Sequence, residues 1–114
     1  METVALELEQ ANSLPPKYKA VASVLRVGKQ SATTTTDIMM LTGIKSKRDV
    51  HEIIEGLINK YGFVIGSSRK GEYKGYFYIA NDEELKETLY TYNKQIQSMI
   101  DRHRNLQKNY SKLR

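Results

Sequence analysis

From Leu85 to Leu113 the apolar residues recur at alternating spacings of four and three. This pattern is typical of one continuous amphipathic helix with a coiled-coil seam. At ~1.5 Å per residue, a helix of ~30 residues is ~45 Å long, which is more than the short chain before it can cover. We therefore predict a helix from Glu83 to about Ser111, capped by Asn81 or Asp82, part of which projects from the body.

The seam of this helix predicts pairing with a second copy of the chain. The residues that we assign to dimerisation are Leu85, Leu89, Tyr92, Ile96, Met99, His103 and Leu106, and Tyr110 and Leu113 continue the same spacing. His103 is the polar member, and a polar residue at a coiled-coil core position commonly fixes register or partner number. The alternative is that the helix folds back on the body of its own chain.

Two helices separated by a glycine-containing turn are predicted in the middle of the chain. The first covers residues 37–42, with a threonine at 35 or 36 as its N-cap and with Ile38 and Leu41 facing inward. Gly43 ends it, because a tight turn needs a residue that tolerates positive φ. Ile44 follows as an apolar anchor.

The second of these helices has the strongest local signal in the body. Ser46 is its expected N-cap, and Asp49 stands three residues later in a capping-box-like arrangement. The helix extends to Tyr61-Gly62. Its apolar residues fall on one stripe at i, i+3, i+4, i+7 and i+8, namely Val50, Ile53, Ile54, Leu57 and Ile58.

A further helix and a β-hairpin flank this pair. Residues 17–27 predict a helix that begins after Pro16 and stops at Gly28. Residues 63–65 and 76–79 predict two strands joined by a polar loop. We interpret Tyr73, Tyr76 and Tyr78 as strand residues that pack on the core rather than as a base-stacking platform. The expected class is mainly α (α+β): a winged helix-turn-helix domain at 15–80, an arm or short helix at 1–14, and the long helix at 81–114.

This order of elements predicts a double-stranded DNA-binding protein. In a winged helix-turn-helix, the second helix of the pair enters the major groove and the hairpin reaches the backbone. We expect the helix at 46–61 and the wing at 66–75 to take these roles. The candidate DNA-binding residues are Lys45, Ser46, Lys47, Arg48, His51, Arg69, Lys70 and Lys74.

Among these residues, Arg48 is expected to contact guanine, the commonest specific pairing. Lys45 and Lys47 are expected to contact phosphate. Arg69, Lys70 and Lys74 are expected to add phosphate contacts, which position the protein without reading sequence. The alternative is that all these charges form an ordinary solvated surface.

The charge distribution agrees with a DNA partner. Residues 1–16 hold three acids and no base, whereas residues 17–80 hold eleven bases and five acids. The helix at 46–61 and the wing at 66–75, which we expect to contact DNA, therefore lie in the positive part of a chain whose net charge is +5.

Composition argues against several other classes. The absence of cysteine removes disulfides, thiolate zinc sites and cysteine nucleophiles, and it agrees with a reducing cytoplasm. Two distant histidines supply a metal site poorly, and no phosphate-cradling loop, nucleophile with its base or convergent carboxylate pair is visible. We expect no enzyme activity, cofactor, metal, secretory signal or membrane span.

Two segments resemble short winged-helix proteins of bacteriophages and prophages of Gram-positive bacteria. They are Thr34–Gly43 with Ser46–Val50, and the hairpin Gly71–Ile79 with its continuation to Leu85. The resemblance implies a transcriptional regulator or a replication factor in the cytoplasm of a bacterial host. The alternative is a winged-helix adaptor or inhibitor that binds a host or phage protein through its tail helix, without DNA.

Overall fold

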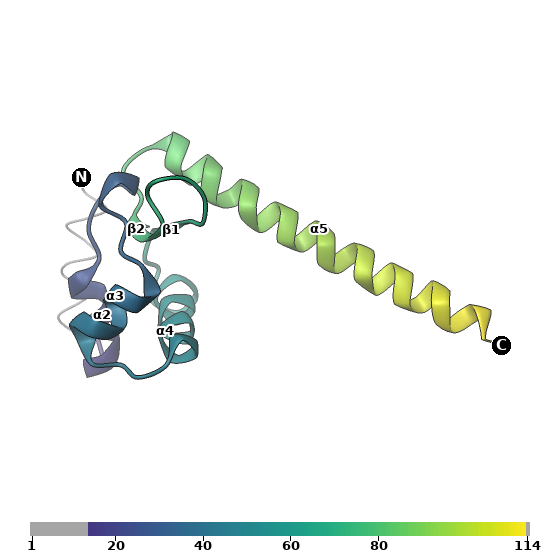
Figure 1. Cartoon of the computed structure of the whole chain (residues 1–114), viewed down its shortest axis with the longest axis horizontal. Helices are drawn as coiled ribbons and strands as arrows, with labels where there is room; N and C mark the ends of the chain where they lie inside the picture. Colours follow the sequence, from purple (N-terminus) through teal and green to yellow (C-terminus); the bar gives the residue numbers. More distant parts are fainter. Residues whose placement is uncertain (1–13, 114) are drawn as a thin grey trace.

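The computed structural model describes residues 14–113 and is mainly helical, with one small antiparallel sheet and a long C-terminal helix (Figure 1). The elements are α2 (Pro16–Val24), the 3₁₀ turn η1 (Lys29–Ser31), α3 (Thr35–Thr42), α4 (Lys47–Asn59), β1 (Ile65–Ser68), β2 (Gly75–Tyr78) and α5 (Asp82–Lys112). The expected arm or short helix at 1–14 lies outside the described residues, except for Leu14, which belongs to the core. No helix within residues 14–113 combines the length and the apolar character that a membrane span needs.

Helix α2 is shorter than the sequence predicts. It ends at Val24, and Leu25 is already extended, so Gly28 does not terminate the helix. The cause lies in β2: the Tyr78 N–H donates to the Arg26 carbonyl at 2.8 Å, and the Gly28 N–H donates to the Tyr78 carbonyl at 2.8 Å. These bonds replace the helical hydrogen bonds that this segment gives up.

Helix α3 corrects two expectations. Its N-cap is Thr34, whose side-chain oxygen accepts the Asp37 N–H at 3.1 Å, so the cap lies before the two threonines that we expected. Ile38 is fully buried, whereas Leu41 is 64% exposed and does not face inward. The packed face of this eight-residue helix comprises Ile38 and the partly buried Met39 and Thr42, which leaves Leu41 on the opposite edge.

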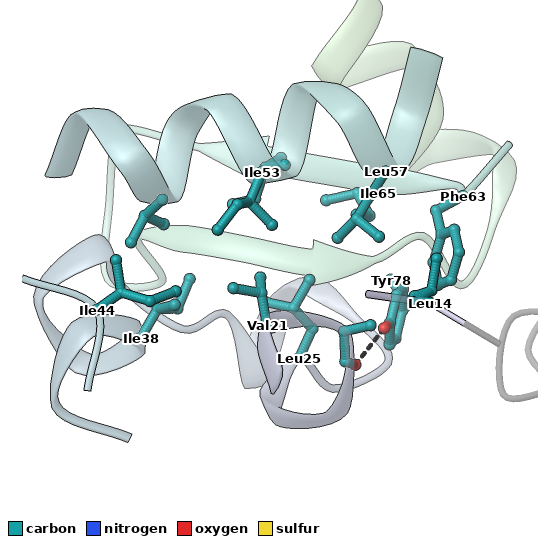
Figure 2. Packing of buried hydrophobic residues seen from close by; sticks show 13 residues of the cluster. Leu14, Val21, Leu25, Ile38, Ile44, Ile53, Leu57, Phe63, Ile65 and Tyr78 are labelled. Atoms are coloured by element: carbon teal, nitrogen blue, oxygen red, sulfur yellow. Dashed lines mark hydrogen bonds between the residues drawn. The ribbon is translucent and has the colours of Figure 1, made fainter. Parts of the chain in front are cut away.

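The turn and helix α4 follow the prediction closely. Gly43 adopts the left-handed conformation at φ 79°, and its N–H donates to the Met39 carbonyl. The Ser46 side chain accepts the Asp49 N–H at 3.0 Å. The stripe on α4 packs on α2, α3 and the sheet (Figure 2). The buried members of the stripe are Val50, Ile53, Ile54 and Leu57, and Ile58 is partly buried.

The sheet consists of two strands in antiparallel register, with Ile65 opposite Tyr78 and Ser68 opposite Gly75. Tyr78 is buried, and its hydroxyl donates to the Ala22 carbonyl (Figure 2). Tyr76 is partly buried against the core, so the packing interpretation holds for both strand tyrosines. Tyr73 lies in the loop before β2 and is exposed, so it is not a strand residue.

The segment before α3 closes the other side of β2. Thr33 pairs with Tyr76 through two backbone hydrogen bonds, of 2.9 Å and 2.8 Å. Gly75 makes this approach possible: its φ is +125°, and a Cβ there would lie 2.2 Å from the Thr33 carbonyl oxygen. Strand β2 is therefore held by β1 on one side and by residues 26–33 on the other.

Helix α5 projects from the body rather than folding back on it (Figure 1). Asn81 caps it by accepting the Glu84 N–H at 3.0 Å. Thr88 is its only buried residue, and every residue from Tyr92 to Leu113 is exposed. Attachment to the body is thus confined to the first turns.

Replacing Gly75 by Ala should destabilise the fold by about 3 kcal/mol or more, because an alanine there meets both a glycine-only conformation and the backbone at Thr33. Gly71→Ala is the matched control, since Gly71 also has positive φ (+80°) but has open space around its Cβ position. That variant should lose only about 1–2 kcal/mol. Urea unfolding measures both; equal losses would contradict the close approach.

Candidate nucleic-acid interface

The start of α4 presents the first group of candidate residues to solvent. Lys45, Lys47, Arg48 and His51 are all exposed. Ser46 is partly buried, and its hydroxyl oxygen is engaged as the N-cap, so its main role is to start the helix. Lys47 and His51 are four residues apart, and Arg48 and His51 three, so these side chains share one face of the helix.

Acidic side chains balance this face. Arg48 Nε lies 3.3 Å from Glu52 Oε1, and both side chains are largely exposed. Asp49 and Glu55 are exposed on the same helix. An exposed i,i+4 ion pair contributes only about 0.3–0.5 kcal/mol, so a stronger partner could displace Glu52 from the guanidinium. With two bases and three acids, α4 has a net charge of −1 and does not attract an anion by itself.

A polar hollow joins α4 to α3 and the hairpin. Its volume is about 490 Å³. It is lined by Thr34, Thr35, His51, Ser67, Ser68, Arg69, Lys74, Gly75 and Tyr76. We call it the polar hollow. It brings together three of the candidate residues, His51, Arg69 and Lys74, which come from two separate segments of the chain.

His51 is oriented by contacts within this hollow. Its Nε2 lies 3.4 Å from the Thr35 hydroxyl oxygen, and its ring meets the Tyr76 ring edge-on, with centroids 6.2 Å apart. Burial raises the pKa of Tyr76 above its ordinary value, and the nearby Tyr92 adds to this, while Arg69 opposes it. The Tyr76 hydroxyl is thus protonated at neutral pH and can donate a hydrogen bond.

Lys70 lies outside the polar hollow, on a second hollow that Arg69 also lines. It lines a hollow of about 320 Å³ between β1 and α5, together with Lys29, Glu87, Tyr90 and Lys94. Lys47 and Arg48, on the first turn of α4, and Lys45, just before the N-cap, lie outside the polar hollow. The eight predicted residues therefore form a group at the start of α4 and a group in the polar hollow, with Lys70 on an adjacent hollow that Arg69 connects to the second group.

Four hydroxyl residues of the polar hollow were not among the predicted candidates: Thr34, Thr35, Ser67 and Ser68. Tyr76 is likewise a member that we expected only to pack. The run of threonines at 33–36 was the available signal, because it places hydroxyls at the positive end of α3. The position of these threonines beside the hairpin depends on tertiary structure, which their spacing in the sequence does not reveal.

Helix α5 is attached beside this surface by polar contacts. The two oxygens of the Glu84 carboxylate accept the backbone N–H of Lys29 at 2.9 Å and the backbone N–H of Ala80 at 2.8 Å. The Lys29 ammonium donates to Glu87 at 2.9 Å. The buried Thr88 hydroxyl accepts the Ser67 N–H at 3.3 Å. These bonds fix where α5 leaves the hairpin.

Within residues 14–113, no three His, Cys, Asp or Glu side chains are grouped so that they could hold a metal ion. Comparisons of the chain with protein families, with curated proteins and with solved structures returned no match.

Thr88→Val should weaken the attachment of α5, because it keeps the side-chain shape but leaves the Ser67 N–H without this acceptor. We expect the free energy of unfolding to fall by about 1–3 kcal/mol. Thr91→Val is the control, because the Thr91 hydroxyl bonds to the Glu87 carbonyl within the exposed helix. An equal effect of the two variants in urea unfolding would contradict the role of Thr88.

Proposed function

We propose that this chain is a winged helix-turn-helix protein that binds double-stranded DNA, with α4 in the major groove and the loop at residues 69–74 on the backbone. The observation that carries the proposal is the polar hollow. It joins the start of α3, the exposed face of α4 and two loop bases into one surface. Charges that are only solvated are not expected to line one hollow together with the start of a helix.

The arrangement suits a duplex on general physical grounds. A major groove is ~12 Å wide and admits one helix, and α4 leaves its Lys47, Arg48 and His51 side free. In this proposal Arg48 exchanges Glu52 for guanine, and Lys45 and Lys47 contact phosphate. Arg69 and Lys74 hold the adjoining backbone, aided by the positive end of α3.

Because α4 carries acids as well as bases, α4 and the loop at 69–74 have different roles in this proposal. Because Asp49, Glu52 and Glu55 offset its bases, α4 contributes mainly selectivity. The loop contributes most of the electrostatic attraction, since Arg69, Lys70 and Lys74 are opposed there by Glu72 alone. In this proposal the protein acts without catalysis, as a phage-type regulator or replication factor in a bacterial cytoplasm.

A second candidate function is an adaptor that binds another protein without DNA. The observation that favours it is on α3, where Met40 and Leu41 are adjacent and are 78% and 64% exposed. Exposed large apolar neighbours of this kind can mark a protein contact. A gel shift that detects no binding to any duplex at low salt would favour the adaptor.

The two parts of the surface should separate in a binding experiment with a target selected from a random duplex pool. Lys47→Ala with Arg48→Ala should abolish the preference for this target over random duplex, because a bidentate base contact contributes about 1–3 kcal/mol. Arg69→Gln with Lys74→Gln should weaken both duplexes alike and lower the slope of log K against log salt by about 1–2. Lys17→Gln with Lys19→Gln, two exposed positions on α2, is the control. Unchanged affinity and salt slope in both test variants would exclude this surface as the DNA-binding surface.

Glu52→Gln should raise DNA affinity, because it removes a charge that repels phosphate and loosens the pairing of Arg48. We expect an increase of about two- to tenfold at 0.1 M salt, and a smaller one at higher salt. Fluorescence anisotropy with a labelled duplex measures it. Glu83→Gln, on the first turn of α5, is the matched control; a loss of affinity in Glu52→Gln would mean that Glu52 itself contacts a base.

A further inference from the structure

Helix α5 carries a long apolar seam that is largely exposed, with Tyr92 lining a hollow beside Tyr76 and His51 of the body. Its apolar members from Leu85 to Leu113 are between 39% and 83% exposed. Around the middle of the helix the seam forms a shallow hollow of about 720 Å³, lined by Tyr92, Gln95, Ile96, Met99, Ile100 and His103. The seam is ~42 Å long at ~1.5 Å per residue. An apolar strip of this length in water favours a partner of the same period.

Charge along α5 is strongly polarised. Its first turns hold Asp82, Glu83, Glu84 and Glu87, with Lys86 as the single base among them. From residue 102 onward it holds Arg102, Arg104, Lys108 and Lys112, with no acid. Two such helices side by side in the same direction would bring both basic ends to one end of the pair, where Arg102 flanks the seam and the other three bases lie on its outer side. Side by side in opposite directions, the acidic start of each would lie beside the basic end of the other, and the helix dipoles would also oppose favourably.

The identity of the facing residues also depends on direction. In a parallel pair each core residue faces its own copy, so His103 faces His103 and Tyr110 faces Tyr110. The seam consists of two alternating sets of positions. One is Leu89, Ile96, His103 and Tyr110, and the other is Leu85, Tyr92, Met99, Leu106 and Leu113. In an antiparallel pair, one set of each helix faces the other set of its partner. The register with the longest overlap sets Ile96 against Met99, Tyr92 against His103, Leu89 against Leu106 and Leu85 against Tyr110. The imidazole then meets a tyrosine ring with a hydroxyl rather than another imidazole.

We propose that two copies of this chain pair through α5 in the antiparallel direction and in this register. The flanking positions on the two helices are compatible with it, because Arg102 then lies beside Gln95, which lines a hollow with Glu55 and Arg69 of the body, and Lys86 lies beside Gln107. Glu83 of one helix lies level with Lys112 of the other. This pairing goes beyond the proposed DNA contact and does not rest on it.

The pairing has a geometric consequence for the two bodies. Thr88, where α5 meets the hairpin, lies level with position 107 of the other copy. The two attachment points are then ~28 Å apart along the pair, from nineteen residues at ~1.5 Å each. A parallel pair would instead set the two bodies side by side at one end.

The sequence contains no cysteine, so introduced thiols are unique. Full-length chains carrying Leu89→Cys or Leu106→Cys, at two exposed seam positions, are prepared separately and then mixed, and each sample is treated with a short bis-maleimide. The antiparallel register predicts a cross-linked dimer in the mixture, with at least tenfold less in either variant alone. Cross-linking of each variant alone would overturn the proposal in favour of a parallel pair. The absence of a cross-link from all three samples would also overturn it.

A seam substitution provides the specificity control. Adding Ile96→Asp to both cysteine chains should remove the cross-link and give a monomer in sedimentation. Ser98→Asp, on the side away from the seam, should leave the cross-link in place. Persistence of the cross-link with Ile96→Asp would overturn the proposal. Failure of the DNA contact is a separate outcome, seen in a gel shift and independent of the cross-linking pattern.

Discussion

Strand β2 is paired on both of its edges, and the rest of the body depends on this arrangement. One edge takes β1, and the other takes the backbone of residues 26–33. The second pairing ends α2 early, draws Thr33 against Tyr76 and thereby sets where α3 begins. Since α3 and the hairpin are fixed to the same strand, the start of α3 and the loop at 69–74 must lie near each other. The polar hollow is the consequence.

Two kinds of contact then divide the molecule. Apolar burial holds α4 against α2, α3 and the sheet, and it leaves the other side of α4 free for a ligand. Polar contacts hold α5, through Glu84, Glu87 and Thr88. A helix attached at one end by a few hydrogen bonds presents its remaining length to a partner. In the proposed assembly the body reads DNA while α5 sets the number and spacing of the bodies.

The features that sequence predicts well are those that neighbouring residues determine. The stripe from Val50 to Leu57, the cap at Ser46 and the turn at Gly43 all depend on local periodicity or conformational preference, and the structure has them where expected. Helix α5 matches within one residue at each end, because its spacing repeats without interruption. The inward position of Leu41 was wrong, because four consecutive apolar residues from Ile38 to Leu41 surround the short helix and do not define one packed face.

Long-range contacts explain the remaining differences. The end of α2 at Val24 could not be predicted from residues 17–28, because it depends on backbone bonds to Tyr78. The separation of Lys70 from Lys74 depends on the position of α5 beside β1, where Lys70 and Arg69 line a second hollow with residues of α5. The hydroxyl residues of the polar hollow come from segments more than thirty positions apart, and no spacing rule connects them.

The central claim is that the face formed by the start of α3, the start of α4 and the 69–74 loop contacts duplex DNA. Its most direct test is a ¹⁵N NMR titration of the full-length chain with a duplex of about 20 base pairs at low salt. We expect the amide signals that move most to come from residues 34–36, 46–52 and 67–75. Signals that move only along α5, or no movement at any duplex concentration, would contradict it.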